Sequence, residues 1–120
     1  MPYVRFRAWQ AADELAFRVY GATQEWPRTE QYGLTSQARR SAVSVPLNLV
    51  EGSSKLGPRE FARFADIAIG SLAELAYLLR FARRLGYIEE VELDALEELR
   101  SRTAQLTWKL VRSLRAAANV

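Results

Sequence analysis

The chain contains no cysteine and no histidine. Without cysteine it can form no disulfide, no thiolate zinc site and no thiol nucleophile. Without histidine it lacks the commonest general base, the base of Ser–His dyads and the Glu-x-x-His pairs that hold di-iron centres in helical bundles. These two absences argue against an enzyme, and we expect no catalytic residue, no metal site and no cofactor.

Long apolar segments are missing as well. No run approaches the roughly 20 apolar residues that are needed to span a bilayer. The first ten residues, MPYVRFRAWQ, lack the apolar stretch and the small-residue cleavage site of a signal peptide. We therefore expect a cytoplasmic protein with no membrane partner, and the sequence indicates no small-molecule substrate.

The chain has the proportions of hydrophobic and charged residues that are usual for a globular protein, with an excess of basic over acidic residues. Its 120 residues are 49% hydrophobic and 26% charged, which suffices for a single domain spanning 1–120 around one core. The formal net charge is +3, the sequence pI is about 9.6, and fifteen of the seventeen basic residues are arginine. Such a charge is compatible with a nucleic-acid partner but does not require one.

Apolar residues recur at helical spacing in four segments, which predicts helices over 6–23, 34–51, 58–85 and 89–117. Gly57 and Pro58 mark the start of the third helix, and Gly86 marks its end. Gly52 is expected to cap the second helix in a left-handed conformation. Two long and two shorter helices with brief connections favour an all-α, antiparallel up-down four-helix bundle.

The second helix is apolar on two sides. One apolar face runs from Leu34 to Leu49, and another lies on nearly the opposite side. A monomer of this size should not expose the second face, so we predict a homo-oligomer. The predicted interface takes apolar residues from the second and third helices, namely Val43, Leu47, Val50, Ile67, Leu78 and Phe81. The alternative is that these faces cover each other within one bundle.

Polar side chains lie between the two apolar faces of this helix. Because a buried charge needs a partner, we predict a structural network in which Arg40 pairs with Glu74 of the third helix. The members of this polar network are Gln37, Arg40, Ser44, Asn48, Glu51 and Glu74. A ligand site or subunit contact at Arg40, Asn48 and Glu51 is the alternative.

Arginines and one tryptophan lie on the outward sides of the third and fourth helices. Arginines contact phosphate oxygens, and an exposed tryptophan can stack on a base. The candidates for nucleic-acid binding are therefore Arg63, Arg80, Arg84, Trp108, Lys109, Arg112 and Arg115. The alternative is a solvated face, with Trp108 in a subunit contact. The acidic residues between Glu89 and Glu98 lie at a helix start, where the helix dipole favours them, and we assign them no site.

Short motifs in a fixed order run through almost the whole chain. They are Trp9–Gln10, Trp26–Pro27, YGLTSQ at 32–37, Arg40, Ser44, Pro46, Asn48, Glu51–Gly52, Phe61, GSL at 70–72, EL at 74–75 and LGY at 85–87. In this order and spacing they resemble the four-helix-bundle family first noticed as proteins encoded by intervening sequences within bacterial large-subunit ribosomal RNA genes. Leu47 departs from the family pattern, which usually has a small polar residue there, and this change enlarges the second apolar face.

The resemblance implies a homo-oligomer, with a pentameric ring as the best-known form. It also implies kinship with the accessory proteins of diversity-generating retroelements, which are basic and work with a reverse transcriptase and its RNA. It implies no reaction. We therefore expect a non-enzymatic binding or scaffold protein whose partners are further copies of itself and RNA or a reverse-transcriptase ribonucleoprotein. A protein–protein interaction module with no nucleic-acid role is the alternative.

Overall fold

Four α-helices make up most of the computed structural model, which describes residues 2–119. They are α1 (Arg7–Thr23), α2 (Leu34–Ser53), α3 (Pro58–Arg84) and α4 (Glu90–Ala118). Two short 3-10 helices, η1 (Pro2–Arg5) and η2 (Arg28–Glu30), precede α1 and α2. The described residues contain no strand. Each predicted helix is confirmed, with bounds that differ by at most two residues.

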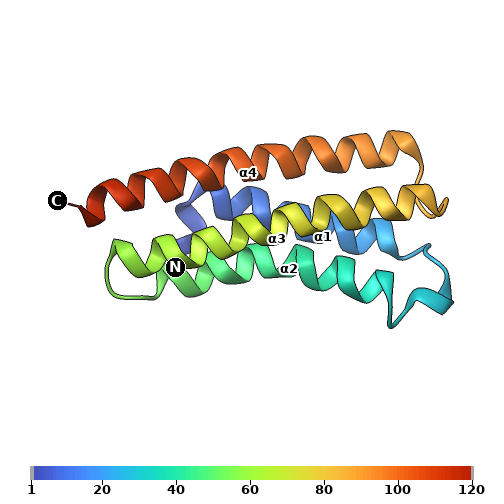
Figure 1. The fold of residues 1–120 in the computed structure, drawn as a ribbon, viewed down its shortest axis with the longest axis horizontal. Helices are drawn as coiled ribbons and strands as arrows, with labels where there is room; N and C mark the ends of the chain where they lie inside the picture. Colours follow the sequence, from blue (N-terminus) through green and yellow to red (C-terminus); the bar gives the residue numbers. More distant parts are fainter. Residues whose placement is uncertain (1, 120) are drawn as a thin grey trace.

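Successive helices run in opposite directions and pack side by side (Figure 1). Both α1 and α3 contact α2 and α4, whereas the diagonal pairs, α1 with α3 and α2 with α4, make no close backbone approach between residues 2 and 119. The four helices therefore occupy the corners of a square, in a body that measures 50 × 24 × 21 Å. The predicted all-α four-helix bundle is confirmed.

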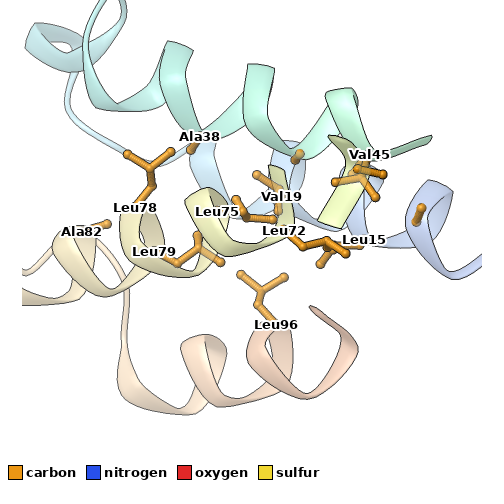
Figure 2. Close-up of a cluster of buried hydrophobic side chains, with 14 of the residues drawn as sticks. Leu15, Val19, Ala38, Val45, Leu72, Leu75, Leu78, Leu79, Ala82 and Leu96 are labelled. Carbon is orange, nitrogen blue, oxygen red and sulfur yellow. The ribbon is translucent and has the colours of Figure 1, made fainter. Parts of the chain in front are cut away.

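The core runs along the axis of this square (Figure 2). Leu15 of α1, Val45 of α2 and Leu75 of α3 are completely buried, and Leu96 of α4 closes the cluster from the fourth side. Burying one such side chain stabilises the fold by about 1.5–3 kcal/mol. Alanines fill the remaining layers, and their small size lets the helices approach one another closely. The fully buried alanines are Ala12, Ala38, Ala42, Ala65, Ala68 and Ala82.

Three glycines have separate roles at the helix ends. Gly57 and Gly86 take positive φ angles of 85° and 81° on either side of α3, as the sequence predicts. Gly52 does not, because it lies within the last turn of α2 and has no positive φ. A Cβ atom there would lie 2.8 Å from the ring of Phe61 and 2.9 Å from the Cβ of Phe64. The predicted left-handed cap was therefore wrong, and Gly52 instead permits close packing of α2 against α3.

Candidate nucleic-acid interface

The charges of the chain are divided unevenly between the two ends of the bundle. The up-down connectivity brings residues 2–8, 51–66 and 105–119 to one end, which we call the basic end (Figure 1). Its basic residues, eight of the seventeen in the chain, are Arg5, Arg7, Lys55, Arg59, Arg63, Lys109, Arg112 and Arg115. Its acidic residues, three of fourteen, are Glu51, Glu60 and Asp66. The formal charge is therefore +5 at this end and −2 over the rest of the chain.

A groove between α3 and α4 concentrates part of this charge. It has a volume of about 450 Å³ and is lined by Arg59, Ala62, Arg63, Asp66, Arg115, Ala118 and Asn119. Nη2 of Arg115 on α4 lies 4.0 Å from Oδ1 of Asp66 on α3, so this pair spans the groove. Three guanidinium groups face one carboxylate, which leaves the groove with the positive charge that a phosphate group requires.

The arginines of the basic end differ in the ion pairs and ring contacts that they make within the described residues. Nε of Arg63 lies 3.2 Å from Oε2 of Glu60, and its guanidinium lies over the ring of Phe64, 4.6 Å from the ring centroid. The hydrogen bond from Arg63 lowers the pKa of the Glu60 carboxyl, and the same bond raises the pKa of Arg63, so both groups stay charged at neutral pH. Arg59 and Arg112 form no ion pair or ring contact among residues 2–119. Their donors are free to bind a ligand.

Trp108 adds an aromatic surface beside these arginines. Its side chain is 42% exposed, whereas Trp26 is buried and Trp9 is half-buried. Trp108 precedes Arg112 by four residues and Arg115 by seven, so all three lie on one face of α4. An exposed indole next to two guanidinium groups can stack on a base while the arginines hold the adjoining phosphates.

The structure does not bring the whole predicted set together. Arg63, Trp108, Arg112 and Arg115 lie at the α3–α4 side of the basic end, but Lys109 lines a different groove, between α1 and α4, with Arg5 and Arg7. Arg80 and Arg84 lie toward the opposite end of α3. The charge of Arg80 there adds to the effect of the Arg100 hydrogen bond, which is the main cause of the lowered pKa of Glu97.

Sequence reasoning missed Arg5, Arg7 and Arg59. They lie at or just before helix starts, where the helix dipole disfavours a positive charge, so no helix-level pattern singles them out. A signal was nevertheless available. Once the up-down bundle had been predicted, a count of charges by bundle end would have gathered them with Arg63 and Arg115.

The predicted polar network is only partly formed. The hydroxyls of Ser44 and Ser71 lie 2.8 Å apart, and Nδ2 of Asn48 donates to the carbonyl and hydroxyl oxygens of Ser44 at 2.7 and 3.0 Å. In addition, Ser41 Oγ donates to the carbonyl of Ser71 at 3.0 Å. Four predicted members, Gln37, Arg40, Glu51 and Glu74, are exposed instead.

The predicted buried pair of Arg40 and Glu74 was wrong for the single chain. Both side chains are exposed, and no ion pair joins them within residues 2–119. The physical reason is the small size of the serines between α2 and α3. They fill the contact between the two helices, so the longer charged side chains on either side of it extend into solvent.

Most of the predicted interface residues do lie on the surface. Leu47 is 59% exposed, Ile67 and Phe81 are also exposed, and Val43 and Val50 are half-buried. Tyr77 adjoins Phe81, with ring centroids 6.0 Å apart, and is exposed as well. We refer to these apolar residues on the α2–α3 side of the bundle, Val43, Leu47, Ile67, Tyr77 and Phe81, as the α2–α3 apolar face; Val43 and Leu47 also line a groove with Tyr20 of α1.

Leu78 is the exception among the predicted interface residues. It is buried in the core beside Ala38 and Ala82 (Figure 2). Leu78 adjoins Leu75 and Leu79 on α3, and both of these side chains point inward. The helical spacing therefore places Leu78 at the edge of the apolar face that is nearest the core, and its side chain is buried there.

Sites of two other kinds are absent from the described part of the chain. Between residues 2 and 119, no three aspartate or glutamate side chains gather closely enough to hold a metal ion. No helix in the same range combines the length and the apolar character needed to cross a membrane.

Comparisons with known proteins agree with this architecture. The family model for the 23S rRNA-intervening sequence protein matches residues 5–109. A crystal structure of a protein of unknown function from the S23 ribosomal protein family of Bacteroides thetaiotaomicron superposes with a TM-score of 0.75, at 20% sequence identity, over 87% of this chain and 97% of that one. A comparison with curated proteins finds no match. Because the family model covers most of its length, this chain belongs to the 23S rRNA-intervening sequence protein family.

Proposed function

We propose that this chain is a non-enzymatic, homo-oligomeric scaffold protein of the cytoplasm that binds RNA through the α3–α4 groove at its basic end. The gathering of Arg59, Arg63 and Arg115 in that groove, with Arg112 and Trp108 beside it, carries the proposal. Arginine binds phosphate oxygens through two parallel hydrogen bonds, and an exposed indole stacks on any base. The link of the family to 23S rRNA intervening sequences supports RNA as the first ligand to test.

Assembly would strengthen such contacts. A single basic end offers few phosphate contacts, and each of them is weakened by salt. In a ring, every copy points the same way along the symmetry axis, so the basic ends lie side by side and bind one RNA with a high effective concentration. The uncovered α2–α3 apolar face supports assembly, and the pentamer implied by the resemblance is the ring we propose.

The test is the binding of a fluorescently labelled single-stranded RNA, followed by anisotropy over a series of salt concentrations. We expect the logarithm of the affinity to fall linearly with the logarithm of the salt concentration, with a slope of roughly 0.7 for each phosphate contact. The double variant Arg112→Ala/Arg115→Ala removes two contacts per subunit. It should bind more weakly and should reduce the slope by about 1.4 for each subunit that contacts the RNA.

The matched control is Arg83→Ala/Arg84→Ala. It removes the same two charges from the last turn of α3, at the other end of the bundle. We expect it to bind RNA almost as the unmodified protein does. An equal loss in both variants would assign binding to net charge rather than to the groove. If the unmodified protein fails to bind RNA even at low salt, the alternative stands: an interaction module for another protein, which the exposed apolar face would serve.

A further inference from the structure

A second apolar surface lies on the side of the bundle opposite the α2–α3 apolar face. It is a groove of about 440 Å³ between α1 and α4, and we call it the α1–α4 groove. Its residues are Glu14, Phe17, Arg18, Gly21 and Ala22 of α1 and Glu92, Ala95 and Leu96 of α4. Phe17 is 78% exposed although it lies in the middle of α1. The other residues between 2 and 119 leave most of this phenyl ring open to solvent.

Gly21 makes this groove hollow. A Cβ atom at Gly21 would meet nothing within 4 Å, so no contact inside the chain requires a glycine there. Glycine within a helix is destabilising by roughly 0.5–1 kcal/mol relative to alanine. Gly52 is different, because Phe61 and Phe64 occupy the space beside it. The empty space next to Gly21 is therefore open to a side chain from outside.

We propose that the α1–α4 groove receives the α2–α3 apolar face of a second copy of this chain. The inference rests on the homo-oligomer of the proposed function and names the two surfaces that join. The shapes are complementary, because Leu47 and Ile67 protrude from one surface near the level of Phe17, while Gly21 and Ala95 leave a hollow beside Phe17 in the other. The exposed Phe17 ring would be buried in the same contact.

The heights of the two surfaces along the bundle also agree. Nε of Arg39 on α2 donates to Thr23 Oγ1 on α1 at 2.7 Å, and Ser44 on α2 meets Ser71 on α3 at 2.8 Å. These bonds fix the register of α2 against both neighbours, and they set the Phe17 turn of α1 level with the middle of α2. Parallel copies placed side by side therefore bring groove and apolar face together without a shift along the axis.

Charge complementarity favours the same contact. Arg40 lies on the outer side of α2 beside the apolar face and forms no ion pair within residues 2–119. The rim of the groove carries Glu14 and Glu92, and of these only Glu14 is paired, with Arg18 at 3.1 Å. A neighbouring copy gives Arg40 the acidic rim as its partner and sets Glu74 toward Arg18. Arg40, Glu74 and Glu92, which form no ion pair within residues 2–119, thereby gain opposite charges from a neighbouring copy.

The proposed contact joins unlike surfaces. If the α2–α3 apolar face paired with itself about a two-fold axis, covering the α1–α4 groove would require a second, different interface. A head-to-tail contact covers both surfaces on every copy with one type of interface, and it closes into a ring when the rotation between neighbours allows.

Cysteine cross-linking tests this arrangement, because the natural chain has no cysteine of its own. Gly21→Cys and Leu47→Cys are made separately, checked for unchanged mass in solution, and treated with a bismaleimide linker long enough to span the roughly 9 Å between their levels along the bundle. We expect each variant alone to give almost no cross-linked dimer and an equal mixture of the two to give abundant dimer. Cross-linking of Leu47→Cys with itself would overturn the proposal in favour of two-fold pairing.

Two further variants complete the experiment. Gln105→Cys, on an exposed part of α4 outside both surfaces, is the control and should not cross-link to Leu47→Cys. A chain with both Gly21→Cys and Leu47→Cys should give a ladder that stops at the subunit number of the ring. If the unmodified protein is a monomer, the homo-oligomer and this inference both fail. If it is an oligomer but the mixture does not cross-link, only this inference fails.

Charge reversal gives an independent readout. Arg40→Glu or Glu92→Arg alone should weaken assembly at least about tenfold, because each sets like charges against each other. The chain with both substitutions should assemble again, since the pair is restored with its signs exchanged. Intact assembly of both single variants, or a loss in the single variants that the double variant does not restore, would contradict the contact between Arg40 and the groove rim.

Discussion

The hydroxyl of Tyr87 donates a 2.9 Å hydrogen bond to Oε2 of Glu30. The other oxygen of that carboxylate, Oε1, accepts the backbone N–H of Leu34 at 3.1 Å. Glu30 thus satisfies a free N–H at the start of α2 while it holds the α3–α4 connection through Tyr87. The ring of Tyr87 also packs against Trp26, with centroids 6.0 Å apart. One carboxylate therefore links two connections at the end of the bundle away from the basic end.

Tyr87→Phe should lower the free energy of unfolding, because it removes the hydrogen bond to Glu30. The ring and its packing on Trp26 remain, so the loss reports the hydroxyl. Urea unfolding followed by circular dichroism measures it. Tyr32→Phe is the control, because Tyr32 is 90% exposed, and it should leave the unfolding free energy unchanged.

The effect of Tyr87 should disappear at alkaline pH. The hydrogen bond to Glu30 is the main cause that raises the pKa of Tyr87 in the folded chain, because it requires the neutral phenol. A pKa raised on folding contributes stability that is complete below the unfolded value, about 10 for tyrosine, and is lost as the pH rises through the folded value. The stability difference between the natural chain and Tyr87→Phe should be constant from pH 7 to 9 and shrink above about pH 10. A difference of the same size at pH 11 would contradict this role.

Gly52→Ala should destabilise the chain by about 1–3 kcal/mol, the usual cost of overpacking a close contact. Its methyl group would press on the ring of Phe61 and the Cβ of Phe64. Gly70→Ala is the matched control, since Gly70 is also within a helix but an added Cβ would meet nothing within 4 Å. That variant should keep or slightly raise the unfolding free energy in dilute solution. Equal losses in both variants would mean that helix geometry, not the contact with Phe61, sets the requirement at Gly52.

The helices could be predicted from the sequence because the signals that define them are local. Apolar spacing sets the phase of each helix, and Gly57, Pro58 and Gly86 set the ends of α3. The sequence was not sufficient for Gly52 or for the pairing of Arg40 with Glu74. Those features depend on the distance between two packed helices, which the small serines of α2 and α3 decide. A pattern along one helix contains no information on that distance.

The candidate site shows the same division. Arg63 and Arg115 were selected because they lie on outward faces of their helices, and the structure places both in one groove. Arg59 lines the same groove but was missed, because a helix start is normally a place for acidic residues. Lys109 lies one position after Trp108, yet the turn of the helix directs it to the α1 side of α4. Membership of a groove depends on which neighbouring helix is present, and only the tertiary structure supplies that.

Ser71→Ala should cost about 0.5–1.5 kcal/mol of unfolding free energy, because it removes the partner of the Ser44 hydroxyl between α2 and α3. Arg40→Ala should change that quantity by less than about 0.5 kcal/mol when measured in dilute solution, since Arg40 is exposed and unpaired in the single chain. Urea unfolding at low protein concentration compares the two. A cost of roughly 3–5 kcal/mol for Arg40→Ala is what the loss of one partner of a buried ion pair produces. That result would support the buried Arg40–Glu74 pair predicted from the sequence.

Leu47→Arg should dissociate the assembly while each chain keeps its helices. Leu47 is 59% exposed on α2, so the substitution adds a charge without disturbing the core, but it would bury that charge unpaired in any contact made by the α2–α3 apolar face. Leu56→Arg is the control, because Leu56 in the α2–α3 connection is 97% exposed and belongs to neither apolar surface. Sedimentation measures the mass, and circular dichroism measures the helix content. We expect only Leu47→Arg to sediment as a monomer. Unchanged assembly of both variants would show that Leu47 does not lie in the interface.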